Sequence, residues 1–178
     1  RWYREAIHVE AHGRKESEGK RRWAAGEVTT DDSERELLAD KVVSLRISSE
    51  DFEGVEKVLS RVTDLRSERR QLLQARLVTE RQGENAALEF MKEAANEIPG
   101  SRLVLSNLTR NLVQNAYRSR SGKQENDESK AQDYASEALE YGNELVEVFP
   151  SPESYHLLAQ AHWLNGNIEP AVDIIEKL

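Results

Sequence analysis

Apolar residues recur along this chain every three or four positions, which is the spacing of amphipathic α-helices. Short segments rich in Gly, Ser, Asn or Pro interrupt the pattern and divide the helices into pairs. The pattern predicts an all-α fold of about five helical hairpins, at about 1–28, 33–63, 67–98, 101–149 and 152–178. Each hairpin can bury its apolar stripe only against its neighbours, so we expect a solenoid of antiparallel hairpins in a single domain.

The regions between the paired helices recur at a fairly regular interval. Turn markers fall near Gly13, Ser49, Gly83, Gly122 and Gly166, with spacings of 36, 34, 39 and 44 residues. In the hairpin at 33–63, a capping-box pattern of Ser33 and Glu36 marks the helix start. The apolar stripes expected there are Leu38, Val42 and Leu45, and then Phe52, Val55, Leu59 and Val62. Those at 67–98 are Leu72, Ala75, Leu77 and Val78, and then Ala87, Phe90, Met91, Ala94 and Ile98.

The hairpin at 101–149 is longer than the others. Its first helix is expected from about Ser101 to Ser119, followed by the polar loop SRSGKQENDES. The buried side of this helix is expected to consist of Leu105, Leu108, Leu112 and Ala116. The second helix carries Ala131, Ala135, Ala138, Tyr141 or Gly142, Leu145 and Phe149 on its apolar side.

The last hairpin, at 152–178, has the clearest boundaries. Ser151 provides an N-cap oxygen, and Pro152 suits the first helical turn. Asn165, Gly166 and Asn167 break the helix, and Asn167 is expected to cap the next one. The apolar stripe of that second helix is Ala171, Ile174, Ile175 and Leu178.

This last hairpin resembles a tetratricopeptide repeat (TPR). Tyr155 stands where the family pattern W-x2-L-G-x2-Y has Trp, and Leu158, Ala159 and His162 stand at its Leu, small and Tyr positions. Ala171 fits the small residue of the family's second helix. In the rest of the chain the resemblance is limited to the spacing of the turns, which brackets the 34-residue period of the family. It implies a superhelix whose first helices line a concave groove that binds peptides.

Composition and charge narrow the possible partners. The chain has 178 residues, of which 38% are hydrophobic and 33% charged, which suits exposed helices with thin apolar stripes. A net charge of −8 argues against generic binding to nucleic acid. The chain has no cysteine and no apolar run of about 18 residues, so we expect neither disulfides nor a membrane span.

The ends of the sequence suggest a fragment of a longer protein, because it begins at Arg1 and both ends fall within helices. The compartment stays open. The cytoplasm is slightly favoured, and the periplasm fits if a signal peptide precedes this segment. Charge is also uneven along the chain: six arginines stand against three acids at 61–81, and eight acids stand against Lys130 at 125–147. Such runs usually form solvated faces.

Catalytic and metal-binding motifs are weak. Glu5, His8 and His12 share one helical face, but HVEAH is not HExxH and further ligands are missing. A second E-x-x-H pattern, Glu153 with His156, lies in the last hairpin, far from the first. We therefore expect no metal, no cofactor and no enzymatic activity.

Polar residues on two helices form the candidate binding surface. Asn107, Asn111, Gln114 and Arg118 form one stripe, which Asn115 borders. Asparagine is a mediocre helix former, and its amide can grip a peptide backbone. On the last hairpin, Glu153, His156, Gln160 and Trp163 form a matching stripe, and His156, Gln160 and Trp163 are its candidate binding residues. A solvated face with hydrogen bonds between repeats explains the asparagines equally well, and Trp163 could instead pack against a following repeat.

The function expected from these features is non-catalytic binding of a protein or peptide in the concave groove. Two alternatives stay open. The chain could be an architectural or sensor arm of a larger signalling or polysaccharide-export protein, because it resembles the helical repeat arrays of such proteins. It could also be an RNA-binding α-solenoid, which the net charge of −8 disfavours. The sequence does not indicate an oligomeric state.

Overall fold

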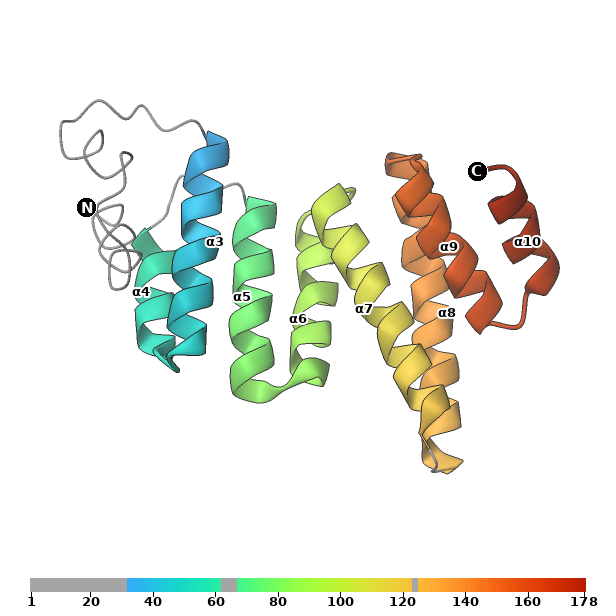
Figure 1. Cartoon of the computed structure of the whole chain (residues 1–178), viewed down its shortest axis with the longest axis horizontal. Helices are drawn as coiled ribbons and strands as arrows, with labels where there is room; N and C mark the ends of the chain where they lie inside the picture. Colours follow the sequence, from blue (N-terminus) through green and yellow to red (C-terminus); the bar gives the residue numbers. More distant parts are fainter. Residues whose placement is uncertain (1–31, 62–66, 123–124) are drawn as a thin grey trace, which may run out of the picture. The chain divides into compact units, whose positions relative to one another are not determined.

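The computed structural model describes residues 32–61, 67–122 and 125–178, which form eight α-helices without a β-strand (Figure 1). The helices are α3 (Asp32–Ser48), α4 (Phe52–Arg61), α5 (Ser67–Gln82), α6 (Glu84–Glu97), α7 (Arg102–Ser121), α8 (Glu125–Val148), α9 (Pro152–Leu164) and α10 (Ile168–Glu176). The expected all-α fold is confirmed for this part of the chain. Three of the expectations lie outside the described residues: the hairpin at 1–28, the capping side chains of Ser33 and Glu36, and the position of Val62.

The chain divides into two compact units, Arg1–Glu84 and Asn85–Leu178. In the first unit, α3, α4 and α5 pack against one another around an aliphatic core. The core consists of Ala39, Val42, Val43, Val55, Val58, Leu59, Leu73 and Leu77. Sequence periodicity identified part of this set, but it was wrong about Leu45, which is 40% exposed. Because α3 contacts both α4 and α5, its buried face is centred on Val42 and Val43, and Leu45 lies at the edge.

The turn between α3 and α4 is fixed by a helix cap. Asp51 Oδ1 accepts a hydrogen bond from Gly54 N at 2.9 Å, which satisfies a free amide in the first turn of α4. The other carboxylate oxygen of Asp51 pairs with Arg46. Glu50 takes a left-handed conformation with φ of 57°, so the chain reverses within three residues of the end of α3.

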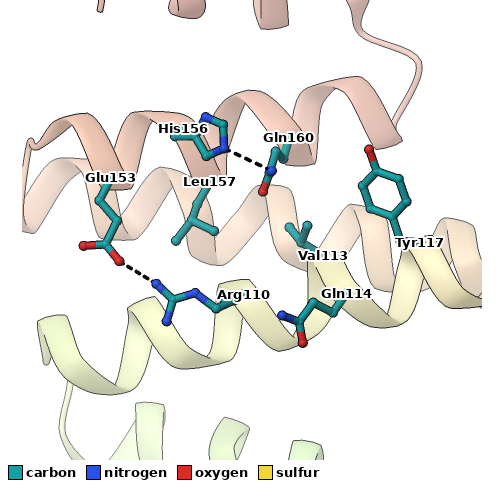
Figure 2. Close-up of a pocket in the computed structure, with 8 residues that line it drawn as sticks. All are labelled: Arg110, Val113, Gln114, Tyr117, Glu153, His156, Leu157 and Gln160. Atoms are coloured by element: carbon teal, nitrogen blue, oxygen red, sulfur yellow. Dashed lines mark hydrogen bonds and ion pairs between the residues drawn. The ribbon is translucent and has the colours of Figure 1, made fainter.

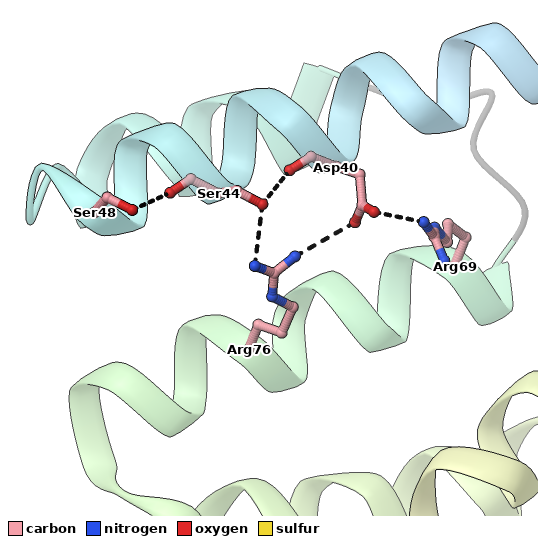
Figure 3. A network of polar contacts seen from close by, with 5 residues as sticks. All are labelled: Asp40, Ser44, Ser48, Arg69 and Arg76. Atoms are coloured by element: carbon pink, nitrogen blue, oxygen red, sulfur yellow. Dashed lines mark hydrogen bonds and ion pairs between the residues drawn. The ribbon is translucent and has the colours of Figure 1, made fainter.

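A polar network joins α3 to α5 in the same unit (Figure 3). The carboxylate of Asp40 pairs with Arg69 at 2.7 Å and with Arg76 at 3.5 Å. Arg76 also donates to Ser44 Oγ at 3.0 Å, and Ser44 in turn donates to the backbone oxygen of Asp40. Elsewhere in the unit, Arg81 pairs with Glu56. Part of the arginine-rich segment therefore holds the unit together instead of forming a purely solvated face. Each exposed pair contributes only about 0–1 kcal/mol.

The second unit is built around the long helices α7 and α8, which lie side by side and antiparallel (Figure 1). Helix α9 packs against both of them, and α10 packs on α9. The predicted buried side of α7 is confirmed, because Leu105, Leu108, Leu112 and Ala116 are all at most 1% exposed. Burial of each of these leucines contributes about 1.5–3 kcal/mol. On α8, Ala131, Ala135, Ala138, Gly142 and Leu145 are buried as expected.

Helix α6 joins this unit through polar contacts with α8. Lys92 pairs with Glu137 of α8 at 2.7 Å and with Glu89 of its own helix at 2.9 Å. Burial by itself would lower the pKa of Lys92, but the two carboxylates outweigh it and raise the pKa above its usual value. Tyr134 of α8 donates to the side-chain oxygen of Asn85 at 3.2 Å.

The long polar loop expected after Ser119 is much shorter in the structure. Helix α7 continues to Ser121 and α8 begins at Glu125. The amide of Gly122 closes α7 by donating to Arg118 O at 3.2 Å. The segment at 125–129 was assigned to the loop because it is polar. It begins with an acidic residue, which is favourable in the first turn of a helix, so polarity alone did not distinguish loop from helix.

The last hairpin starts as the sequence predicts but packs differently. Ser151 Oγ accepts from Ser154 N at 3.2 Å, and Gly166 turns the chain with φ of +78°. Asn167 occupies the N-cap position of α10, but its side chain makes no capping bond, which corrects one expectation. The apolar stripe of α10 is a second correction. Ala171 is buried, but Ile175 is about half exposed because α9 covers only one side of the helix, and Leu178 lies beyond the end of α10 and is also about half exposed.

Candidate functional site

Helices α7 and α9 form a pocket of about 330 Å³ on one side of their interface. Figure 2 shows the residues that line it, which come equally from the two helices. They are Arg110, Val113, Gln114 and Tyr117 of α7, and Glu153, His156, Leu157 and Gln160 of α9. On each helix these residues follow the spacing of a single face, so the regular packing of α7 on α9 is enough to create the pocket.

The pocket has an apolar floor and a polar rim. Val113 and Leu157 are 4% and 5% exposed and pack between the helices. At one end, Arg110 of α7 forms an ion pair with Glu153 of α9, so the two charges balance across the rim (Figure 2). Along α9, Gln160 Nε2 donates to His156 Nε2 at 3.1 Å. The amide of Gln160 keeps its oxygen for a further partner, and Gln114 is exposed on the facing helix.

A second, apolar pocket of about 300 Å³ adjoins the first and shares Tyr117 and Gln160 with it. Its walls are Tyr117, Ala159, Gln160, Trp163, Ile168, Ala171, Val172, Ile175 and Glu176. The rings of Tyr117 and Trp163 stack with centroids 5.4 Å apart and planes inclined by 23°. Both rings are about half exposed, and Tyr117 lines both pockets whereas Trp163 lines only the apolar one.

The structure brings together four of the eight predicted site residues. Gln114, His156 and Gln160 line the polar pocket, and Gln160 and Trp163 line the apolar one. The stripe predicted on α9 therefore lies along the two pockets.

The other four predicted residues, all on α7, line neither pocket. Asn107 donates to Leu103 O of its own helix at 2.8 Å. Asn111 and Arg118 are exposed, and Asn115 is half-buried. Their expected position in a concave groove stays a prediction.

Sequence reasoning missed four residues of the polar pocket, Arg110, Val113, Tyr117 and Leu157, and placed Glu153 on the polar stripe of α9 without naming it a binding residue. The face of α7 that meets α9 is rotated by roughly a quarter turn from the asparagine stripe, and Gln114 lies where the two overlap. The predicted site on α7 was chosen by residue type, whereas the face of α7 that lines the pocket is determined by how the helix packs against α9. The helical spacing of residues 110, 113, 114 and 117 was visible in the sequence. It shows that these residues share one face of α7, but not that α9 packs against that face.

The described residues offer little for metal binding or transmembrane insertion. No group of three or more His, Asp or Glu residues gathers there in a way that could hold a metal ion. Glu5, His8 and His12 lie outside this part of the chain. None of the described helices is long and apolar enough to cross a membrane.

No family model fits the sequence, and no curated protein is detectably similar to it.

Proposed function

We propose that this chain is a non-catalytic binding module and that the polar pocket between α7 and α9 holds an extended segment of another protein. The observation that carries the proposal is the meeting of Gln114, His156 and Gln160, from two helices, above the apolar floor of Val113 and Leu157. Amides and a neutral imidazole can both donate and accept hydrogen bonds, as a peptide backbone requires. The floor can accept an apolar side chain of the same segment.

The residues of the pocket do not suggest catalysis. Its charged groups, Arg110 and Glu153, are already paired with each other. The pocket holds no serine or cysteine beside His156 that could act as a nucleophile. On this proposal the chain is a TPR-like repeat array, and its first helices present the binding surface. An architectural or sensor arm of a larger protein is the second candidate, supported by the long, ion-paired helices alone.

A selection experiment tests the binding function. Peptides displayed in random sequence would be selected on the immobilised chain, and the binding of enriched peptides would be measured by fluorescence anisotropy. Replacing Gln114 and Gln160 together by alanine should weaken binding by about 1–3 kcal/mol, because the lost hydrogen bonds belong to the complex. Thermal stability should hardly change, because Gln114 is exposed and Gln160 bonds only within its own helix.

Two controls locate the surface. Gln82→Ala removes an exposed glutamine in the first unit and should not affect binding. Asn111→Ala with Asn115→Ala tests the neighbouring asparagine face of α7. If this double variant loses binding while the Gln114 and Gln160 variant retains it, the groove lies on the asparagine face instead. Failure to enrich any peptide would favour the architectural role.

A further inference from the structure

Exposed apolar side chains gather on α9 and α10. Of the nine large hydrophobic residues that are exposed in the described part of the chain, five lie between 163 and 178. They are Trp163, Ile168, Val172, Ile175 and Leu178, each 45–54% exposed. Single exposed hydrophobic residues are common, but a contiguous group beside a groove marks an interaction surface.

Three of these residues, Ile168, Val172 and Ile175, lie on a face of α10 that α9 does not cover. Ala171 is buried and Ile174 is half-buried on the side toward α9. Ile168, Val172 and Ile175 are spaced by four and three positions, so they form a second stripe on the same helix. This stripe and the Tyr117–Trp163 pair both line the apolar pocket of about 300 Å³. We name it the α9–α10 groove.

The α10 side of this groove is acidic. Glu169, Asp173 and Glu176 are all exposed, and Glu176 lines the groove itself. They lie roughly 100° around the helix from the apolar stripe, so they flank one edge of the groove. Lys177 is the single basic residue of 168–178. A ligand in the groove therefore meets an apolar surface with negative charge along one side.

We infer that the α9–α10 groove binds an amphipathic α-helix of a partner protein that carries Lys or Arg along one flank of its apolar face. Apolar side chains at positions i, i+3, i+4 and i+7 would fit against Val172, Ile175 and Trp163, and the basic flank would face the three carboxylates. A second copy of this chain fits less well, because it brings its own acidic rim and a net charge of −8. An anionic membrane surface would be repelled for the same reason.

The inference is tested with three synthetic peptides of equal length and equal apolar content. The first has an apolar helical face flanked by lysines, and the second has glutamates in place of the lysines. The third has the lysines but scrambled apolar positions. Binding to the full 178-residue chain would be measured by titration calorimetry at low and at physiological salt. We expect the first peptide to bind about tenfold or more tightly than either of the others, and its affinity to fall with salt.

Matched variants then locate the binding site. Val172→Ser removes an apolar group from the groove, whereas Val148→Ser changes a valine of nearly equal exposure, 46% against 47%, that does not line it. Val172→Ser should weaken binding of the first peptide by about tenfold, and Val148→Ser should not. Circular dichroism on both variants confirms that they fold. Val172→Ser should also leave the extended peptides of the polar pocket bound, so the two sites are distinguished.

The other outcomes would overturn the inference. Equal binding of the lysine and glutamate peptides would mean that the acidic rim does not select the partner. No binding of the first peptide, or equal effects of the two serine variants, would remove the groove as its site. If sedimentation shows a dimer that Val172→Ser dissociates and Val148→Ser does not, a second copy covers the groove.

Discussion

At the scale of single residues, Asn165 holds the end of α9 to α8. Its Nδ2 donates to Ala135 O at 2.6 Å and to Ala161 O at 2.9 Å. Its Oδ1 accepts from Gln132 at 3.0 Å and from Ser136 at 3.2 Å. An asparagine amide has two donor hydrogens and two acceptor positions, so this side chain uses its full capacity. From the sequence, Asn165 was predicted only to be part of the turn after α9, and its contacts with α8 were not predicted.

Replacing Asn165 should destabilise the protein more than replacing the neighbouring Asn167. Asn165→Ala should lower the free energy of unfolding by about 1–3 kcal/mol, since it removes the side-chain hydrogen bonds to Ala135, Gln132 and Ser136 that join the end of α9 to α8. Asn165→Asp should cost at least as much, because carboxylate oxygens would face the carbonyls of Ala135 and Ala161. Asn167→Ala is the control, because that side chain makes no capping bond. Urea denaturation measures all three variants, and equal losses at both positions would contradict this account.

His162 is expected to make stability depend on pH. Burial lowers its pKa, and its Nδ1 is buried without a hydrogen-bond partner. Between the folded and unfolded pKa values the unfolded chain binds more protons, so stability should fall as the pH drops below the ordinary histidine value of about 6.5. Thermal unfolding of His162→Gln should show a smaller loss between neutral and mildly acidic pH than the unchanged chain. Gln82→Ala, which changes no titratable group, is the control and should retain the full pH dependence.

At the scale of helices, Gly142 marks a close approach of α8 to α7 and α9. A Cβ at this position would lie 3.3 Å from Leu158 Cδ1 and 3.6 Å from both Leu158 Cα and Thr109 Cγ2. A glycine within a helix costs about 1 kcal/mol relative to alanine, so its presence indicates that space is limiting. The sequence pattern allowed either Tyr141 or Gly142 on the buried side of α8. In the structure Gly142 is buried and Tyr141 is half-buried.

Side chains of increasing size at position 142 should separate these two effects. Gly142→Ala should change the free energy of unfolding by less than about 1 kcal/mol, because the gain in helix propensity offsets a small displacement of Leu158. Gly142→Val should lower it by about 1–3 kcal/mol, because its methyl groups overlap Leu158 and Thr109. Chemical denaturation compares the two variants. A valine variant as stable as the alanine variant would show that α8 and α9 can move apart freely.

At the scale of the whole molecule, the second unit has a core of its own, and both pockets lie within it. A fragment of residues 85–178 should therefore fold alone, with a helical circular dichroism spectrum and one cooperative urea transition. Its free energy of unfolding should be about 5–10 kcal/mol, as is typical of a domain of this size. Peptides selected for the polar pocket should bind this fragment as they bind the full chain. A non-cooperative transition would show that the unit depends on the rest of the chain.

Local signals in the sequence were enough to predict most of the described helices. The cap at Ser151 and the turn at Gly166 are properties of a few adjacent residues, and both appear as expected. Which face of a helix is buried depends on neighbours that periodicity cannot identify, so Leu45 and Ile175 were assigned wrongly. The pairing of Tyr117 with Trp163 depends on packing between helices far apart in the sequence, and residue type gave no sign of it.

The stacked rings of Tyr117 and Trp163 also give this chain an optical probe at its own binding surface. Aromatic rings held 5.4 Å apart in a fixed orientation couple electronically, so the pair should contribute to the near-ultraviolet circular dichroism and should transfer excitation from tyrosine to tryptophan. Because Tyr117 lines both pockets, a ligand bound in either one changes the surroundings of this ring. Occupation of the surface can thus be followed without a label, through the spectral contribution of this aromatic pair.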